Sequence, residues 1–185
     1  MSKTPRRVAT VLAAAILTSL AIGGVAHAGG GVTTASTTGS GTYALLGTTP
    51  TDFSFAAVAH ENGNVGGELW VSTVFQGFAI EFTGDVTCVT DDPVNHRAWV
   101  GGVITSNSST HPSFITPRTQ VGEDIWFRVV DYGEGNGAPA DRSTFVGFAG
   151  DAEIQTSLEY CAVQPWPADD ARTWAVTDGN IQVHD

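Results

Sequence analysis

The sequence predicts an all-β fold, either an antiparallel β-sandwich or a β-barrel of about 8–10 short strands with one disulfide. Three observations support this prediction. From residue 52 onward, short runs rich in Val, Ile, Thr and aromatic residues alternate with clusters of Gly, Pro, Asn and Asp. No stretch after residue 28 keeps the 3.6-residue periodicity of a long amphipathic helix. Cys88 and Cys161 are the two cysteines of the chain.

Residues 1–28 have the layout of a secretory signal peptide. Three positive charges in the first seven residues precede an apolar run over residues 8–22, and Ala26-His27-Ala28 is a small-x-small cleavage site. A membrane anchor is the alternative, but the apolar run is short for a membrane span. We therefore expect a secreted, extracellular protein whose mature chain begins at Gly29.

The expected mature chain is strongly acidic. Residues 29–185 contain five arginines, no lysine and all 19 Asp and Glu residues, so their formal net charge is 5 − 19 = −14. Such a surface repels nucleic acids and anionic membranes. We therefore expect no nucleic-acid partner and no membrane contact after signal cleavage. The charge suits solubility, cation binding or a basic partner.

The mature chain is expected to begin with a flexible segment over residues 29–51, which are rich in Gly, Ser and Thr. A single β domain is expected over residues 52–185. Its first strand is the weakly alternating run over residues 53–59, which ends at the turn Asn62-Gly63-Asn64.

The next two strands are predicted to form a hairpin around Gln76-Gly77. Folding the chain back at this dipeptide pairs Phe75 with Phe78 and leaves Trp70 on the outer face. Gln is unfavourable at the first position of the tightest hairpin turns, so a four-residue loop is an equal alternative. The side chains that would share the inner face are Leu69, Val71, Thr73, Phe75, Phe78, Ile80 and Phe82.

Further strands are predicted over residues 85–90, 97–105, 124–131, 144–149, 173–177 and 180–184. Asp178-Gly179 predicts a hairpin turn between the last two strands. Gly101-Gly102 within a strand predicts a bulge or a close backbone approach. Residues 153–160 suit a short helix or another strand. The long segment 106–122 is expected to be either functional or disordered.

The two cysteines of an exported protein are expected to pair, here as a Cys88–Cys161 disulfide. Closing a loop of about 70 residues would stabilise the fold by about 4 kcal/mol in the chain-entropy model. A two-cysteine metal site and free thiols are the alternatives. Neither cysteine belongs to a C-x-x-C motif or a Cys/His cluster, which favours the disulfide.

Three motifs occur in order along the chain: G-x-V-x-C from Gly84, A-x-V-G-G-V from Ala98, and F-x-V-x-D-x-G-E-G from Phe127. As a set they resemble a family of small exported bacterial β-rich proteins, mainly actinobacterial. The resemblance covers residues 50–185, including the ending from Gly179. It implies export and a compact β domain, and no catalytic residue is carried over from it.

The glycine-rich loop after the predicted strand 124–131 is the clearest candidate metal site. Asp131, Glu134, Asn136 and Asp141 lie within eleven residues. Oxygen ligands on a flexible loop are what Ca²⁺ requires, so these four residues are a hypothetical Ca²⁺ site. The alternative is a solvated loop whose Asp and Asn residues set the turns. No other cofactor is expected.

Aromatic side chains offer a candidate binding surface. Trp70, Trp99 and Trp126 would bind a carbohydrate or apolar ligand if they were exposed on outer strand faces. The alternative is that both faces are covered and these rings pack inside. Glu68 and Glu81 share the outer face of the predicted hairpin as a possible pair for glycoside hydrolysis, although they are not directly opposite each other.

No established catalytic motif occurs in the sequence. H-E-x-x-H and G-x-S-x-G are both absent, so no catalytic residue is assigned. We therefore expect a secreted, non-catalytic binding or structural module. Its expected partner is an extracellular ligand such as a carbohydrate or another cell-envelope component. The alternative is a secreted hydrolase that acts on polysaccharide through a surface carboxylate pair.

Overall fold

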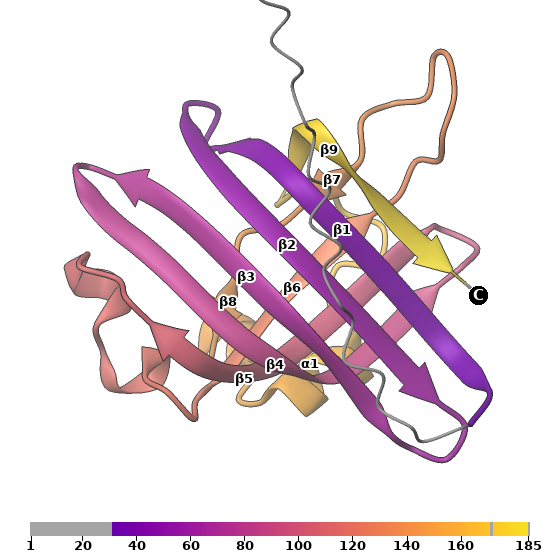
Figure 1. The fold of residues 1–185 in the computed structure, drawn as a ribbon, viewed down its shortest axis with the longest axis horizontal. Coiled ribbons are helices and arrows are strands. Elements are labelled where there is room, and N and C mark those ends of the chain that lie inside the picture. Colours follow the sequence, from indigo (N-terminus) through magenta and orange to yellow (C-terminus); the bar gives the residue numbers. More distant parts are fainter. Residues whose placement is uncertain (1–30, 171, 185) are drawn as a thin grey trace, which may run out of the picture.

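The computed structural model describes residues 31–170 and 172–184 (Figure 1). The predicted signal peptide, residues 1–28, and Gly29 lie outside the described residues, so secretion stays a prediction. Within the described ranges, no helix is long and apolar enough to span a membrane.

The described residues form mainly strands, with four short helices. The strands are β1 (Thr33–Leu45), β2 (Thr49–His60), β3 (Val65–Phe75), β4 (Phe78–Asp92), β5 (Arg97–Asn107), β6 (Asp124–Val130), β7 (Arg142–Ser143), β8 (Gly147–Phe148) and β9 (Trp174–His184). The helices are η1 (Pro112–Phe114), η2 (Pro117–Thr119), η3 (Asp151–Glu153) and α1 (Ser157–Val163).

All strand pairs are antiparallel, in the order β5-β4-β3-β2-β1-β9-β7-β6-β8. β5 also pairs with β6, from Arg97 opposite Val130 to Val103 opposite Asp124. This pairing closes the sheet on itself, so the fold is a barrel rather than a sandwich. The all-β prediction is confirmed. β7 and β8 lie along the same side of β6 as two pieces of one interrupted strand.

β1 corrects the prediction of a flexible segment over residues 29–51. It pairs along most of its length with β2 on one side and β9 on the other. Ala35, Thr37, Tyr43 and Leu45 share one face and are buried. The Thr-rich sequence therefore alternates as a strand does, although its composition is that of a linker. The β domain begins within residues 29–51 and not at residue 52.

The β3–β4 hairpin has the predicted register. Phe75 pairs with Phe78, Thr73 with Ile80 and Val71 with Phe82, as the predicted register requires. Gln76 (φ 52°) and Gly77 (φ 83°) form a two-residue turn, so the alternative of a four-residue loop is not realised. Trp70 lies on the outer face, as predicted.

The predicted hairpin at Asp178-Gly179 is wrong, because β9 continues through it as one strand. Gly179 (φ 121°) lies opposite Gly41 of β1, and a Cβ at Gly179 would lie 2.0 Å from Ser40 O. The dipeptide therefore permits a close approach of two strands instead of a turn. The predicted strand over residues 144–149 is only partly right, since the chain leaves the sheet between β7 and β8.

A bulge in β4 turns Cys88 out of the barrel. The register of β4 against β5 shifts between Val86 and Cys88, so Val86 joins the interior core while Cys88 reaches Cys161 of α1. The predicted Cys88–Cys161 disulfide is confirmed. A Cβ at Gly102 would lie 2.4 Å from Asp85 O, which confirms the close backbone approach predicted at Gly101-Gly102, and a Cβ at Gly101 would lie 2.7 Å from Cys88 Sγ.

Side chains fill much of the barrel interior. A cavity of about 20 Å³ lies between β1, β2, β3 and β6, roughly the space of one water molecule. The long segment 106–122 is an ordered cap, not a disordered loop. Asn107 Nδ2 donates to Phe114 O at 2.8 Å and to Thr119 O at 2.6 Å, and the Phe114 ring packs edge-on against Phe82. This filling directs the search for a ligand site to the outer surface.

Candidate functional site

The outer face of β9, β1, β2 and β3 carries an open groove of about 500 Å³. In Figure 1, β1, β2 and β3 form the front wall of the barrel, whereas β5, β6 and α1 lie behind them. Two rows of paired side chains cross these strands. The first row is Asn180, Ser40, Ser54, Trp70 and Thr83; the second is Gln182, Thr38, Ala56, Glu68 and Asp85.

The groove exists because small side chains lie between larger ones. The centre of both rows consists of the Ser, Thr and Ala residues of β1 and β2. Trp70 and Glu68 of β3 form one wall, and Asn180 and Gln182 of β9 form the other. The resulting trough combines one indole, two amides, a carboxylate and a floor of hydroxyl groups.

Hydrogen bonding restrains Trp70 at the rim of this groove. Its Nε1 donates to Glu81 Oε1 at 3.3 Å. Glu68 faces Asp85 directly across the β3–β4 pair, and no Arg, Lys or His is among the described residues that line the groove. The groove is therefore polar and negatively charged, and the outer-face positions predicted for Trp70, Glu68 and Glu81 are confirmed.

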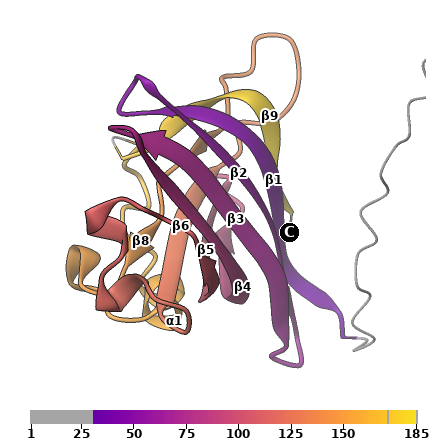
Figure 2. The ribbon, with the colours of Figure 1, turned by 60° about the vertical axis from the view of Figure 1, so that its left-hand side comes forward.

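The two other predicted binding residues, Trp99 and Trp126, are covered. They are 0% and 3% exposed, because α1 and the chain that follows it lie over the outer face of β5 and β6 (Figure 2). Trp126 stacks on Tyr160 of α1, and Trp99 Nε1 donates to Pro165 O at 3.0 Å. The prediction of exposed rings is wrong at these two positions, and the alternative of a covered face holds.

The acidic loop binds its own chain. Asp131 Oδ2 accepts from Val183 N at 3.0 Å, and Asp141 Oδ2 accepts from Ile181 N at 2.8 Å. Glu134 Oε1 likewise accepts from Asn180 Nδ2 at 2.8 Å, and Asn136 is exposed. Within residues 31–170 and 172–184, no group of three or more His, Cys, Asp or Glu side chains is placed to hold a metal ion. The Ca²⁺ hypothesis stays a prediction, which thermal melts with CaCl₂ and with EDTA would test.

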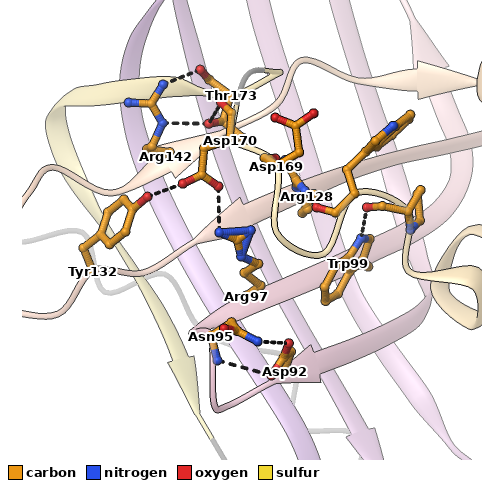
Figure 3. Close-up of polar contacts among 12 residues, drawn as sticks. Asp92, Asn95, Arg97, Trp99, Arg128, Tyr132, Arg142, Asp169, Asp170 and Thr173 are labelled. Atoms are coloured by element: carbon orange, nitrogen blue, oxygen red, sulfur yellow. Dashed lines mark hydrogen bonds and ion pairs between the residues drawn. The ribbon is translucent and has the colours of Figure 1, made fainter.

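A second polar site, which was not predicted from the sequence, lies on the far wall of the barrel (Figure 3). β5, β6 and β7 present Arg97, Arg128 and Arg142 on their outer face. Residues 164–170, which we call the strap, follow α1 and cover part of this cluster. The sequence did contain one sign of this site. Residues two apart on a strand share a face, so Arg97 lies on the same covered face as Trp99, and Arg128 on the same covered face as Trp126.

Arg128 is fully buried and is held by main-chain oxygens of the strap. Its Nη1 donates to Trp166 O and its Nη2 to Asp169 O. Burial lowers the pKa of the Arg128 guanidinium. These contacts attach the strap to the centre of β6.

Asp170 connects the strap to two further side chains. Its Oδ1 lies 2.8 Å from Arg97 Nη2, an ion pair that lacks hydrogen-bond geometry. Tyr132 Oη donates to Asp170 Oδ2, and this hydrogen bond raises the pKa of Tyr132. Asp170 is thus a carboxylate bound between an arginine and a tyrosine.

Comparison with known proteins finds no matching family model, no matching curated protein and no matching solved structure.

Proposed function

We propose that this protein is a secreted, non-catalytic module that binds neutral carbohydrate in the groove beside Trp70. The observation that supports the proposal is the combination of an indole wall, an amide wall and a hydroxyl-rich floor in one open trough. The expected ligand is a glycan of a cell envelope or of the surrounding medium.

These groups match the chemistry of a sugar ring. A pyranose has an apolar C–H face, which can pack on the large apolar surface of an indole. Its hydroxyl groups both donate and accept, as do the side-chain amides of Asn180 and Gln182 and the hydroxyls of Ser40 and Ser54. Binding sites for small molecules typically combine an aromatic surface with a few polar groups in fixed positions.

The charge of the groove favours a neutral ligand over an acidic one. Glu68 lines the groove, and Asp85 and Glu81 lie next to it on β4. Carboxylates at this density repel phosphate-, sulfate- or uronate-bearing polymers. The groove would therefore discriminate against anionic polysaccharides and nucleic acids.

Affinity electrophoresis in gels that contain neutral polysaccharides tests the proposal. Trp70→Ala should weaken binding at least about tenfold, since it removes the stacking surface. Val74→Ala is the matched control, because Val74 is exposed on the same strand but does not line the groove. Retardation that is equal in both variants, or absent in the unmodified protein, would contradict a binding role and favour a structural module.

A secreted polysaccharide hydrolase is the second candidate, and one observation favours it. Glu68 and Asp85 are directly opposite on the outer face beside Trp70, and directly opposite side chains have Cβ atoms about 5 Å apart. From Cβ atoms at this spacing, the two carboxyl groups can approach to the separation of about 5 Å that retaining glycosidases use. Release of reducing ends from a neutral glycan, lost in Glu68→Gln and in Asp85→Asn, would support this candidate over the non-catalytic module.

A further inference from the structure

Three buried nitrogen atoms of the arginine cluster have no hydrogen-bond acceptor among the described residues. They are Arg97 Nε, Arg97 Nη1 and Arg128 Nε. The side chain of Arg97 is 9% exposed, and Arg128 is 0% exposed. A guanidinium stays charged in a protein, and unpaired donors that are removed from water are destabilising. These donors therefore point to an acceptor that carries negative charge.

The surroundings of these donors are basic, in contrast to the rest of the chain. Three aspartates lie beside the cluster, namely Asp92, Asp169 and Asp170. The four arginines at the cluster or against the strap bring the local formal charge to 4 − 3 = +1, whereas the remainder of residues 29–185 carries 1 − 16 = −15. The arginines at the cluster or against the strap are Arg97, Arg128, Arg142 and Arg172.

Asp170 pairs with only one end of the Arg97 guanidinium. Its side chain is 33% exposed, and it meets Arg97 through Nη2 alone. In Figure 3 the guanidinium of Arg97 faces Asp170 and the Tyr132 hydroxyl.

We propose that Arg97 and Arg128 form a binding site for a single oxyanion group, supplied by inorganic phosphate or by the carboxylate of a small molecule. Guanidinium groups bind both kinds of oxyanion through charge-assisted hydrogen bonds. The site lies on β5 and β6, away from the strands that form the groove beside Trp70. It is thus independent of the proposed carbohydrate binding.

Thermal melts of the mature protein test the proposal, with phosphate and glucuronate in separate titrations against chloride at matched ionic strength. Binding to the folded state alone should raise the melting temperature by about 3–6 °C at a tenfold excess over the dissociation constant. In a separate calorimetric titration of the folded protein, the binding heat should saturate. A response to one anion only assigns the source of the oxyanion. A response to both phosphate and glucuronate shows that the site binds the oxyanion group that the two have in common.

Arg97→Lys is the decisive variant, because it keeps the positive charge and the pairing with Asp170 but removes the guanidinium donors. It should fold and lose the saturable response. Arg118→Lys is the matched control, since Arg118 is exposed and pairs loosely with Asp151 at 3.7 Å. Trp70→Ala should also keep the response. No saturable response in the unmodified protein, or an equal response in Arg97→Lys, would overturn the site.

Discussion

The carboxylate of Asp141 joins two stretches of chain that lie far apart in the sequence. Its Oδ1 accepts from Tyr132 N at 3.0 Å and its Oδ2 from Ile181 N at 2.8 Å, and the residue is 8% exposed. β7 contributes only two residues to this edge of β9. The carboxylate oxygens of Asp131 and Asp141 therefore accept hydrogen bonds from N–H groups of β9 that would otherwise donate to the carbonyl oxygens of a longer neighbouring strand.

Asp141→Asn should lower the free energy of unfolding by about 1–3 kcal/mol. The amide keeps one acceptor oxygen, so its NH₂ group would face one of the two N–H donors. Glu123→Gln removes an exposed carboxylate and is the control, with an expected change within about 0.5 kcal/mol. Urea denaturation measures both variants, and equal midpoints would show that Asp141 does not hold the loop to β9.

At the residue scale, spacing predicted which side chains face outward but not what covers them. Trp99 and Arg128 lie directly opposite each other on the outer face of β5 and β6. Their partners, Pro165 and Asp169 among them, follow in an irregular segment far along the chain. Because no periodic pattern connects the two regions, the arginine cluster could not be predicted from the sequence.

At the element scale, strands with clear alternation were predictable and glycine-rich strands were not. The hairpin at Gln76-Gly77 followed from seven positions, six of them apolar, that share one face only in one register. β1 and β9 contain the opposed residues Gly41 and Gly179, which permit two backbones to approach closely. From the sequence alone, such glycines are equally typical of a linker or a turn, since their partner strand is unknown.

The Cys88–Cys161 disulfide fixes α1 against the β4 bulge. Replacing both cysteines with serine should destabilise the fold by about 4 kcal/mol and lower the melting temperature by about 8–15 °C. Scanning calorimetry of the double variant and of the reduced parent protein measures this effect. If both melt like the oxidised protein, then packing of Trp126 on Tyr160 holds the helix without the disulfide.

At the scale of the whole molecule, the closed barrel separates two kinds of outer wall. The wall of β1, β2 and β3 is open and carries the groove with its carboxylates, whereas the wall of β5 and β6 is covered by α1 and the strap (Figure 2). The all-β class followed from local patterns, but this division did not. It depends on strand closure, which pairs residues that are distant in the sequence.

All three tyrosines of the chain should resist ionisation in the folded state. Burial raises the pKa of Tyr43 and Tyr160, and the hydrogen bond to Asp170 raises that of Tyr132. Their contribution to stability is therefore complete below the unfolded pKa of about 10 and is lost as the pH rises above it. Ionisation of the two buried tyrosines, Tyr43 and Tyr160, should raise the absorbance at 295 nm only together with loss of the circular dichroism signal. A rise near pH 10 that corresponds to all three tyrosines in a still-folded protein would contradict these environments.

Binding of neutral carbohydrate beside Trp70 can be measured by NMR titration with a neutral oligosaccharide. The five tryptophans supply five indole N–H resonances as internal reporters. We expect the resonances of the Trp70 indole and of the amides of Ser40, Ser54 and Asn180 to shift on binding, while the resonance of the covered Trp99 indole does not. Unchanged spectra across neutral glycans, or shifts confined to residues outside the groove, would exclude binding at this site.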